Sequence, residues 1–237
     1  MIPLVFYNIF ILFLCVSVGL FTVFTIFQKA KRDKESVSFA WYLFLMLVIF
    51  ALDALRLLFA YFGYFQIDRI LFYSLFVVAP IAMIPCLYHL VLKIGFQERF
   101  AKIAGLAGFV MMLVIFLLML KDGIKGPIIT DWGNQYSLFG IGAVVLNIGF
   151  LGKYTIIIYD LVSRAGTWIR EKKIIDSYRW FTSLTMFMIC SIMALETTGL
   201  FQAGWQLFLF RILFLIAVLV NYLSYTSEEV MTKFKSL

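Results

Sequence analysis

The stretch Phe50-Ala51-Leu52-Asp53-Ala54-Leu55-Arg56-Leu57-Leu58-Phe59 places an acid and a base one helical turn apart within an apolar run of membrane-spanning length. A charge at the depth of a bilayer costs roughly 2.5 kcal/mol or more, so it needs a partner, a water-filled cavity or a function. Three further charged residues, Lys153, Glu196 and Arg211, also lie within apolar runs. The fold and the function of this chain therefore depend on where these five charges lie relative to a membrane and to each other.

The composition of the chain is that of an integral membrane protein. Of its 237 residues 64% are apolar and 14% are charged, whereas about 25% of an ordinary soluble domain is charged. Apolar runs of about 20 residues, the length that crosses a bilayer as a helix, recur along the whole chain. We therefore predict an all-α fold, a single seven-helix membrane bundle over residues 1–237. The predicted spans cover residues 4–28, 38–60, 70–93, 102–120, 138–162, 180–199 and 205–225.

The positions of the basic residues predict the orientation of the bundle. The net charge is +7, but the charges lie in short loops beside apolar runs, where Lys and Arg set topology, and this argues against a nucleic-acid partner. Fourteen Lys and Arg residues fall in the loops on one side and only three on the other. Because the basic side faces the cytoplasm, we expect the N-terminus outside and the C-terminus in the cytoplasm. The expected location is the cytoplasmic (inner) membrane of a bacterium.

With this orientation, four of the charged residues fall in one outer layer. The helix rise of about 1.5 Å per residue puts Asp53 and Arg56 in the outer part of the second span, with Glu196 and Arg211 at similar depth on the last two. A tight turn joins those two spans, so Glu196 and Arg211 are placed to meet. The four residues are either interhelical ion pairs that fix packing or the polar part of an outward-facing ligand pocket.

The longest loop, residues 121–136, lies on the outer side of the predicted bundle and is a candidate lid for such a pocket, with Asp131 and Trp132 near its middle. A second polar group is expected deeper in the membrane. Lys153 and Asp160 are seven residues apart on the fifth predicted span, which places them on one helix face as an inner polar stripe.

The sequence offers no convincing catalytic or cofactor site, and we predict neither enzyme activity nor a bound cofactor. Cys86 and His89 are three residues apart and are two candidate metal ligands, but a closed zinc site needs about four, so a core-packed Cys and a hydrogen-bonded His are favoured. A single histidine excludes haem held by two histidines of this chain. The inner loop 164–180 mixes Trp and Ile with Arg and Lys, which is typical of a segment that binds anionic lipid or docks a cytoplasmic partner.

The layout resembles the seven-span sensor region found at the N-terminus of some bacterial histidine kinases and diguanylate cyclases. The resemblance is carried by the basic first inner loop Lys29–Lys34, by Asp53 and Arg56, by the long outer loop and by a last span that runs into a polar tail. It covers nearly the whole chain but includes no diagnostic motif. It implies a sensor without the usual output domain, which would have to signal to a separate protein.

Three functions remain open at this point. The first is a sensor or receptor-like module that binds a small ligand or senses the envelope and signals to a separate partner in the membrane or cytoplasm. The second is a non-catalytic structural subunit of a larger membrane complex, in which the intramembrane charges hold helices together. The third is a small transporter or channel. Membrane lipids are expected partners in each case, and homo-oligomerisation is left open.

Overall fold

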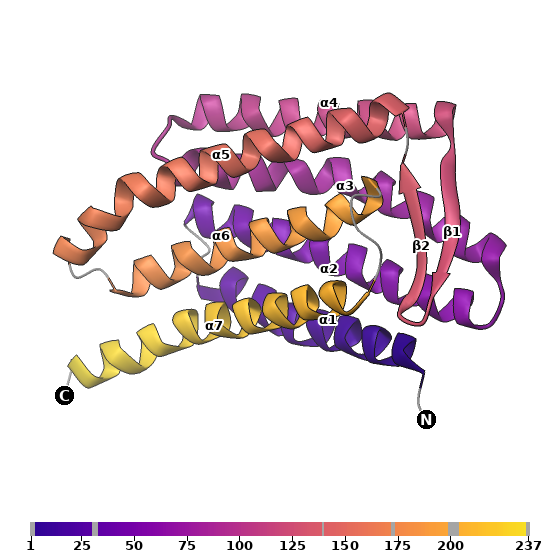
Figure 1. The fold of residues 1–237 in the computed structure, drawn as a ribbon. Coiled ribbons are helices and arrows are strands. Elements are labelled where there is room, and N and C mark those ends of the chain that lie inside the picture. Colours follow the sequence, from indigo (N-terminus) through magenta and orange to yellow (C-terminus); the bar gives the residue numbers. More distant parts are fainter. Residues whose placement is uncertain (1–2, 30–32, 139, 172–173, 199–203, 236–237) are drawn as a thin grey trace.

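The computed structural model describes residues 3–29, 33–138, 140–171, 174–198 and 204–235; for residues 156, 160–171, 174–179 and 227–235 it describes the backbone only. Seven helices and one β-hairpin make up the described chain (Figure 1). The helices are α1 (Leu4–Lys29), α2 (Lys34–Tyr61), α3 (Phe65–Lys93), α4 (Glu98–Asp122), α5 (Gly140–Glu171), α6 (Ile174–Leu195) and α7 (Trp205–Lys235).

All seven helices are long and apolar enough to cross a membrane, as the sequence predicted. They extend beyond the predicted spans at several ends: α3 begins at Phe65 instead of residue 70, α5 continues to Glu171 and α6 begins at Ile174. The extra turns mix polar with apolar residues. Hydropathy detects only the part of a helix that matches the hydrocarbon, whereas backbone hydrogen bonding continues into the interfacial residues. Most of the inner loop predicted at 164–180 is therefore helical backbone, and its side chains up to residue 179 lie outside the described part.

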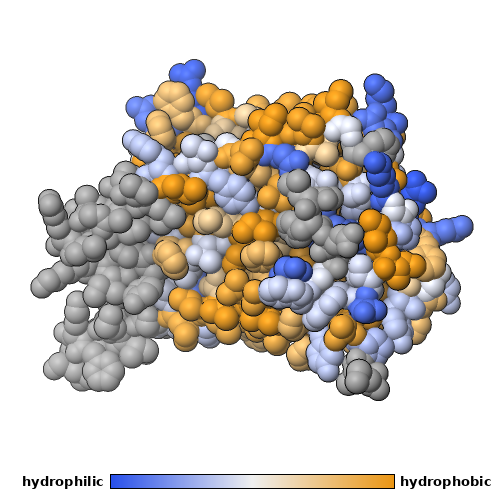
Figure 2. Space-filling view, viewed as in Figure 1, coloured by the Kyte–Doolittle hydropathy of each residue, from blue (hydrophilic) through white to orange (hydrophobic). Residues whose placement is uncertain are grey.

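The helices form a ring in chain order. Each helix packs against the next one, and α7 packs against α1, which closes the ring. Helix α1 begins, and α7 ends, at opposite ends of the molecule (Figure 1). Exposed apolar side chains cover the middle of the face drawn in Figure 2, and hydrophilic side chains gather mainly toward the end that carries the β-hairpin. This distribution fits a helical bundle whose sides face lipid.

The connection between α4 and α5 is a β-hairpin, so the prediction of a loop at residues 121–136 was wrong. Strands β1 (Ile124–Thr130) and β2 (Gly133–Leu138) pair antiparallel, with Thr130 opposite Gly133 and a two-residue turn between them. Ile and Thr residues favour the pleated strand, and a two-residue connection is the commonest way to join two strands. Strand β2 is buried almost throughout, whereas β1 lies outside it and is largely exposed.

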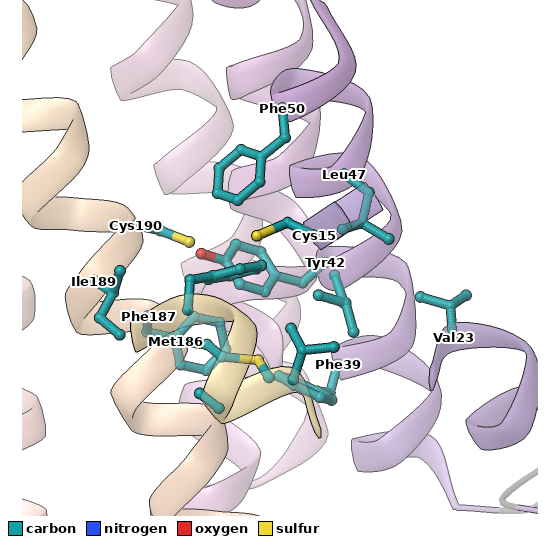
Figure 3. Close-up of a cluster of buried hydrophobic side chains, with 14 of the residues drawn as sticks. Cys15, Val23, Phe39, Tyr42, Leu47, Phe50, Met186, Phe187, Ile189 and Cys190 are labelled. Atoms are coloured by element: carbon teal, nitrogen blue, oxygen red, sulfur yellow. The ribbon is translucent and has the colours of Figure 1, made fainter. Parts of the chain in front are cut away.

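The apolar core has two parts. The larger one joins α1, α2, α6 and α7, with contributions from α3 and α5, and the smaller one joins α3, α4, α5 and the hairpin. Figure 3 shows the larger cluster where α1, α2 and α6 meet: the side chains of Cys15, Tyr42 and Cys190 point toward one another. All three cysteines of the chain are free thiols buried in this bundle.

Candidate functional site

The acid and base of the second helix form the centre of a buried ionic network. The Arg56 Nε donates to Asp53 Oδ1 over 2.9 Å, as the spacing of three residues on one helix allows. The other carboxylate oxygen, Asp53 Oδ2, accepts from Arg211 Nη2 at 2.6 Å. One carboxylate therefore holds two guanidinium groups and links α2 to α7.

The network continues into α3 and the hairpin. Arg56 Nη1 lies 3.4 Å from Asp68 Oδ1 and donates to the backbone carbonyl of Asn134 at 2.9 Å. Asp68 is fully buried and also accepts from Tyr136 Oη at 2.9 Å and from Asn134 Nδ2 at 3.3 Å. Burial, and then the hydrogen bond to Asp68, raises the pKa of the Tyr136 phenol, which keeps the hydroxyl protonated as a donor to that carboxylate.

Aromatic rings and one further helix complete the polar layer at the hairpin end of the bundle. The Arg56 guanidinium carbon lies 5.9 Å from the centre of the Phe72 ring and 6.0 Å from that of Tyr136. Gln135 Nε2 donates to the backbone carbonyl of Glu196 at 3.1 Å, which ties β2 to the end of α6. Helices α2, α3, α6 and α7 and the hairpin are thus joined in one polar layer.

The structure brings together three of the four residues predicted for the outer layer and places the fourth beside them. Asp53, Arg56 and Arg211 are in direct contact. Glu196 begins the 3-10 turn Glu196–Thr198 after α6, and it lines the same cavity as the other three. Arg211 pairs with Asp53 and not with Glu196, so the contact that the short connection favoured is not the one observed.

The residues proposed as a lid lie in the hairpin but do not border the cavity. Asp131 is exposed at the turn. The Trp132 ring packs against Phe208, 5.5 Å between ring centres, and its carbonyl accepts from Asn8 Nδ2 at 2.8 Å. These contacts fasten the hairpin tip to α1 and α7. The residues that reach the cavity are Gln135 and Tyr136 of β2.

Sequence reasoning missed Asp68 and the three polar residues of β2, Asn134, Gln135 and Tyr136. Asp68 was assigned to a loop because the third span was started at residue 70, although an acid in the first turn of a helix is a normal feature. A strand with one buried face shows alternating polar and apolar residues, because neighbouring side chains point to opposite faces. The three β2 residues are all buried and all polar, so they do not show this alternation. They are buried on both sides because the strand caps the end of a helical bundle.

Beneath the hairpin lies a cavity of about 180 Å³. Its wall is mainly apolar and comes from α1 to α7, with Phe72, Phe76, Met83, Met112 and Phe150 among the contributors. Five charged side chains also border it: Asp53, Arg56, Lys153, Glu196 and Arg211. Tyr42, Phe50 and Cys190 belong both to this wall and to the apolar cluster of Figure 3, so the wall of the cavity is continuous with that cluster. A mostly apolar cavity with a few convergent polar groups is the usual form of a small-molecule site.

Lys153 borders the same cavity from α5, away from the outer layer. Its Nζ donates to Ser191 Oγ at 2.9 Å and lies 5.3 Å from the centre of the Phe187 ring. The Ser191 hydroxyl in turn donates to the backbone carbonyl of Phe187. The side chain of Asp160, its predicted companion in an inner stripe, lies outside the described residues.

The two residues considered as metal ligands do not converge on a site within the described chain. His89 Nδ1 lies 2.8 Å from the Glu35 carbonyl oxygen, toward the end of the bundle away from the hairpin. No group of three His, Cys, Asp or Glu side chains is placed to hold a metal ion among the described residues.

No protein-family model, curated protein or solved structure matches this chain.

Proposed function

We propose that this chain is a receptor-like module of the bacterial cytoplasmic membrane, with its N-terminus outside, that binds a small ligand beneath the β-hairpin. The observation that carries the proposal is the cavity of about 180 Å³, which combines a mainly apolar wall with a charged outer end. Under the orientation predicted from the loop charges, the end of the cavity that the hairpin covers faces the outer side of the membrane. The resemblance in layout to the sensor regions of histidine kinases and diguanylate cyclases points to the same function.

A route for the signal is built into α7. Arg211 borders the cavity and holds Asp53, and the same helix continues without a break to Lys235. Because a helix is stiff, a shift or rotation at Arg211 is transmitted along the 24 residues that follow it to the opposite end of the bundle. There it would be read by a separate protein partner. The ligand needs to bind one arrangement of the Asp53–Arg211 contact better than the other.

The proposal is tested by thermal unfolding of the purified protein against a library of small organic acids, amines and alcohols. A ligand that occupies the cavity raises the unfolding temperature of the wild type. In Ala79→Leu, which adds three carbons at the cavity wall, that rise is expected to be lost. Ala107→Leu, on the exposed face of α4, is the matched control and should keep it.

If no compound shifts the unfolding temperature, or if Ala79→Leu responds like Ala107→Leu, the ligand-binding function is wrong. The ionic network would then serve packing alone, as in a structural subunit of a membrane complex. Flux of a bound compound across liposomes would instead indicate a carrier.

A further inference from the structure

The two arginines of the ionic network differ in how many acceptors they have. Arg56 contacts Asp53, Asp68 and the Asn134 carbonyl. Arg211 is only 3% exposed and donates to Asp53 through Nη2 alone, whereas its Nε and Nη1 are buried with no hydrogen-bond partner among the described residues. A buried donor without an acceptor costs free energy, so a structure retains one where something else supplies the acceptor.

The position of Arg211 shows where that acceptor would lie. Its side chain borders the cavity beneath the hairpin, so an acceptor for its remaining nitrogens can come from a molecule in the cavity. A guanidinium carries five N–H donors in a planar fork that matches a carboxylate, and Asp53 uses only one nitrogen of that fork. The group therefore keeps hydrogen-bonding capacity for a second carboxylate.

The charge around the cavity favours an anion over a cation. Three of the five charged side chains that border it are basic, namely Arg56, Arg211 and Lys153, and two are acidic. Asp68 offsets Arg56 from behind the wall, so the cations with hydrogen-bonding capacity to spare for a ligand are Arg211 and Lys153. Among the described side chains, Lys153 contacts a hydroxyl and an aromatic ring. The negative charge of Glu196 would favour a cationic amine as the ligand. Amines are therefore the ligand class that the test compares with carboxylates.

The apolar part of the cavity wall determines how large and how apolar the body of the ligand can be. Beyond the charged residues the cavity is bordered by aromatic rings and methionines of α3, α4 and α5. Its volume of about 180 Å³ is close to that of an apolar cavity of roughly 150 Å³ that accepts benzene. The space suits one ring or a short branched chain together with one small polar group.

We infer that the cavity binds a small organic carboxylate, with its anionic group on Arg211 and its apolar body against the rings of α3 and α5. This inference rests on the proposed ligand-binding function and adds the chemical class of the ligand. Lys153 supplies a second positive charge, which stabilises the anion through space.

The test uses three probes of nearly equal size: benzoate, benzamide and benzylamine. Binding to the wild-type protein in lipid nanodiscs is measured by ligand-observed NMR and by thermal unfolding. Benzoate is expected to bind at least tenfold more tightly than benzamide or benzylamine. R211K, which keeps a cation beside Asp53 but loses the planar fork, should weaken benzoate binding at least tenfold. R69K makes the same change at an exposed arginine and should bind benzoate as the wild type does.

Glu196→Gln keeps the test decisive if R211K does not fold. Removal of that negative charge should tighten benzoate binding and leave benzamide binding unchanged. Equal or stronger binding of benzamide or benzylamine overturns the carboxylate assignment and leaves the ligand-binding function intact. Failure of all three probes to bind also overturns the assignment, whereas the library screen with Ala79→Leu decides the broader function separately.

Discussion

At the scale of single residues, the sharing of Asp53 by two arginines is the feature with the largest expected effect on stability. Both pairs are buried, with side-chain exposures of 7% and 15% for Arg56 and Asp53 and 4% for Arg211. Asp53→Asn leaves Arg211 without its hydrogen-bonded anion, and loss of one partner of a buried pair costs about 3 kcal/mol or more. We expect a clear loss of unfolding free energy in detergent, larger than that of Arg211→Met, which leaves Asp53 paired with Arg56.

The double variant Asp53→Asn/Arg211→Met separates this coupling from a general loss of packing. If the two side chains act on each other, the double variant is less destabilised than the sum of the single changes. Glu98→Gln, which breaks the exposed 2.7 Å pair with Lys34, is the control and should leave stability unchanged. Strict additivity of the first two changes would show that their contact does not contribute.

The sequence could predict part of this network, and its limits follow from physics. The Asp53–Arg56 contact depends only on helical spacing, so the sequence was enough to predict it. The partner of Arg211 depends on how α7 is rotated against α2, which no local pattern records, and proximity in sequence favoured Glu196 wrongly. The sequence did not identify Asp68 as part of the network, because its side chain lies at the end of a span. There, hydropathy no longer separates a buried charge from an exposed one.

At the scale of elements, the helices were predictable and the hairpin was not. A run of about 20 apolar residues has few alternatives to a helix in a bilayer, because backbone hydrogen bonds must be satisfied within the segment. Strand β2 shows the opposite case. Asn134, Gln135 and Tyr136 are polar residues that the hairpin buries against the bundle. Only the tertiary fold reveals that Gln135 and Tyr136 border the cavity from above.

The hairpin offers a paired test of its role above the cavity. A Cβ at Gly126 would lie 2.7 Å from the Gln135 carbonyl oxygen, which is too close for an unshifted backbone, whereas a Cβ at Gly123 would meet nothing within 4 Å. Both glycines have positive φ, 116° and 81°, so backbone strain is common to the two substitutions. We expect Gly126→Ala to separate β1 from β2 and to expose residues 124–138 to protease, with Gly123→Ala much less affected. Equal cleavage of the two variants would show that strand contact at Gly126 is not needed.

At the scale of the whole molecule, the hairpin and the ionic layer lie at one end of the bundle, and the cavity extends from them toward its middle. The first half of α7 borders the cavity, and its second half reaches the other end. This division suits a receptor, because binding and output are separated by one continuous helix. It has that meaning only if the hairpin end is outside the cell and the other end is in the cytoplasm.

The orientation can be measured with single cysteines. Cys15, Cys86 and Cys190 are buried, so background labelling is expected to be low. Asp131→Cys at the hairpin turn and Lys102→Cys near the start of α4 are both at exposed positions, at opposite ends of the bundle. If the side with fourteen basic loop residues is cytoplasmic and the side with three is outside, a membrane-impermeant maleimide should label Asp131→Cys in intact cells and Lys102→Cys only after lysis. The reverse pattern would put the cavity on the cytoplasmic side, and the ligand would then have to be an intracellular molecule.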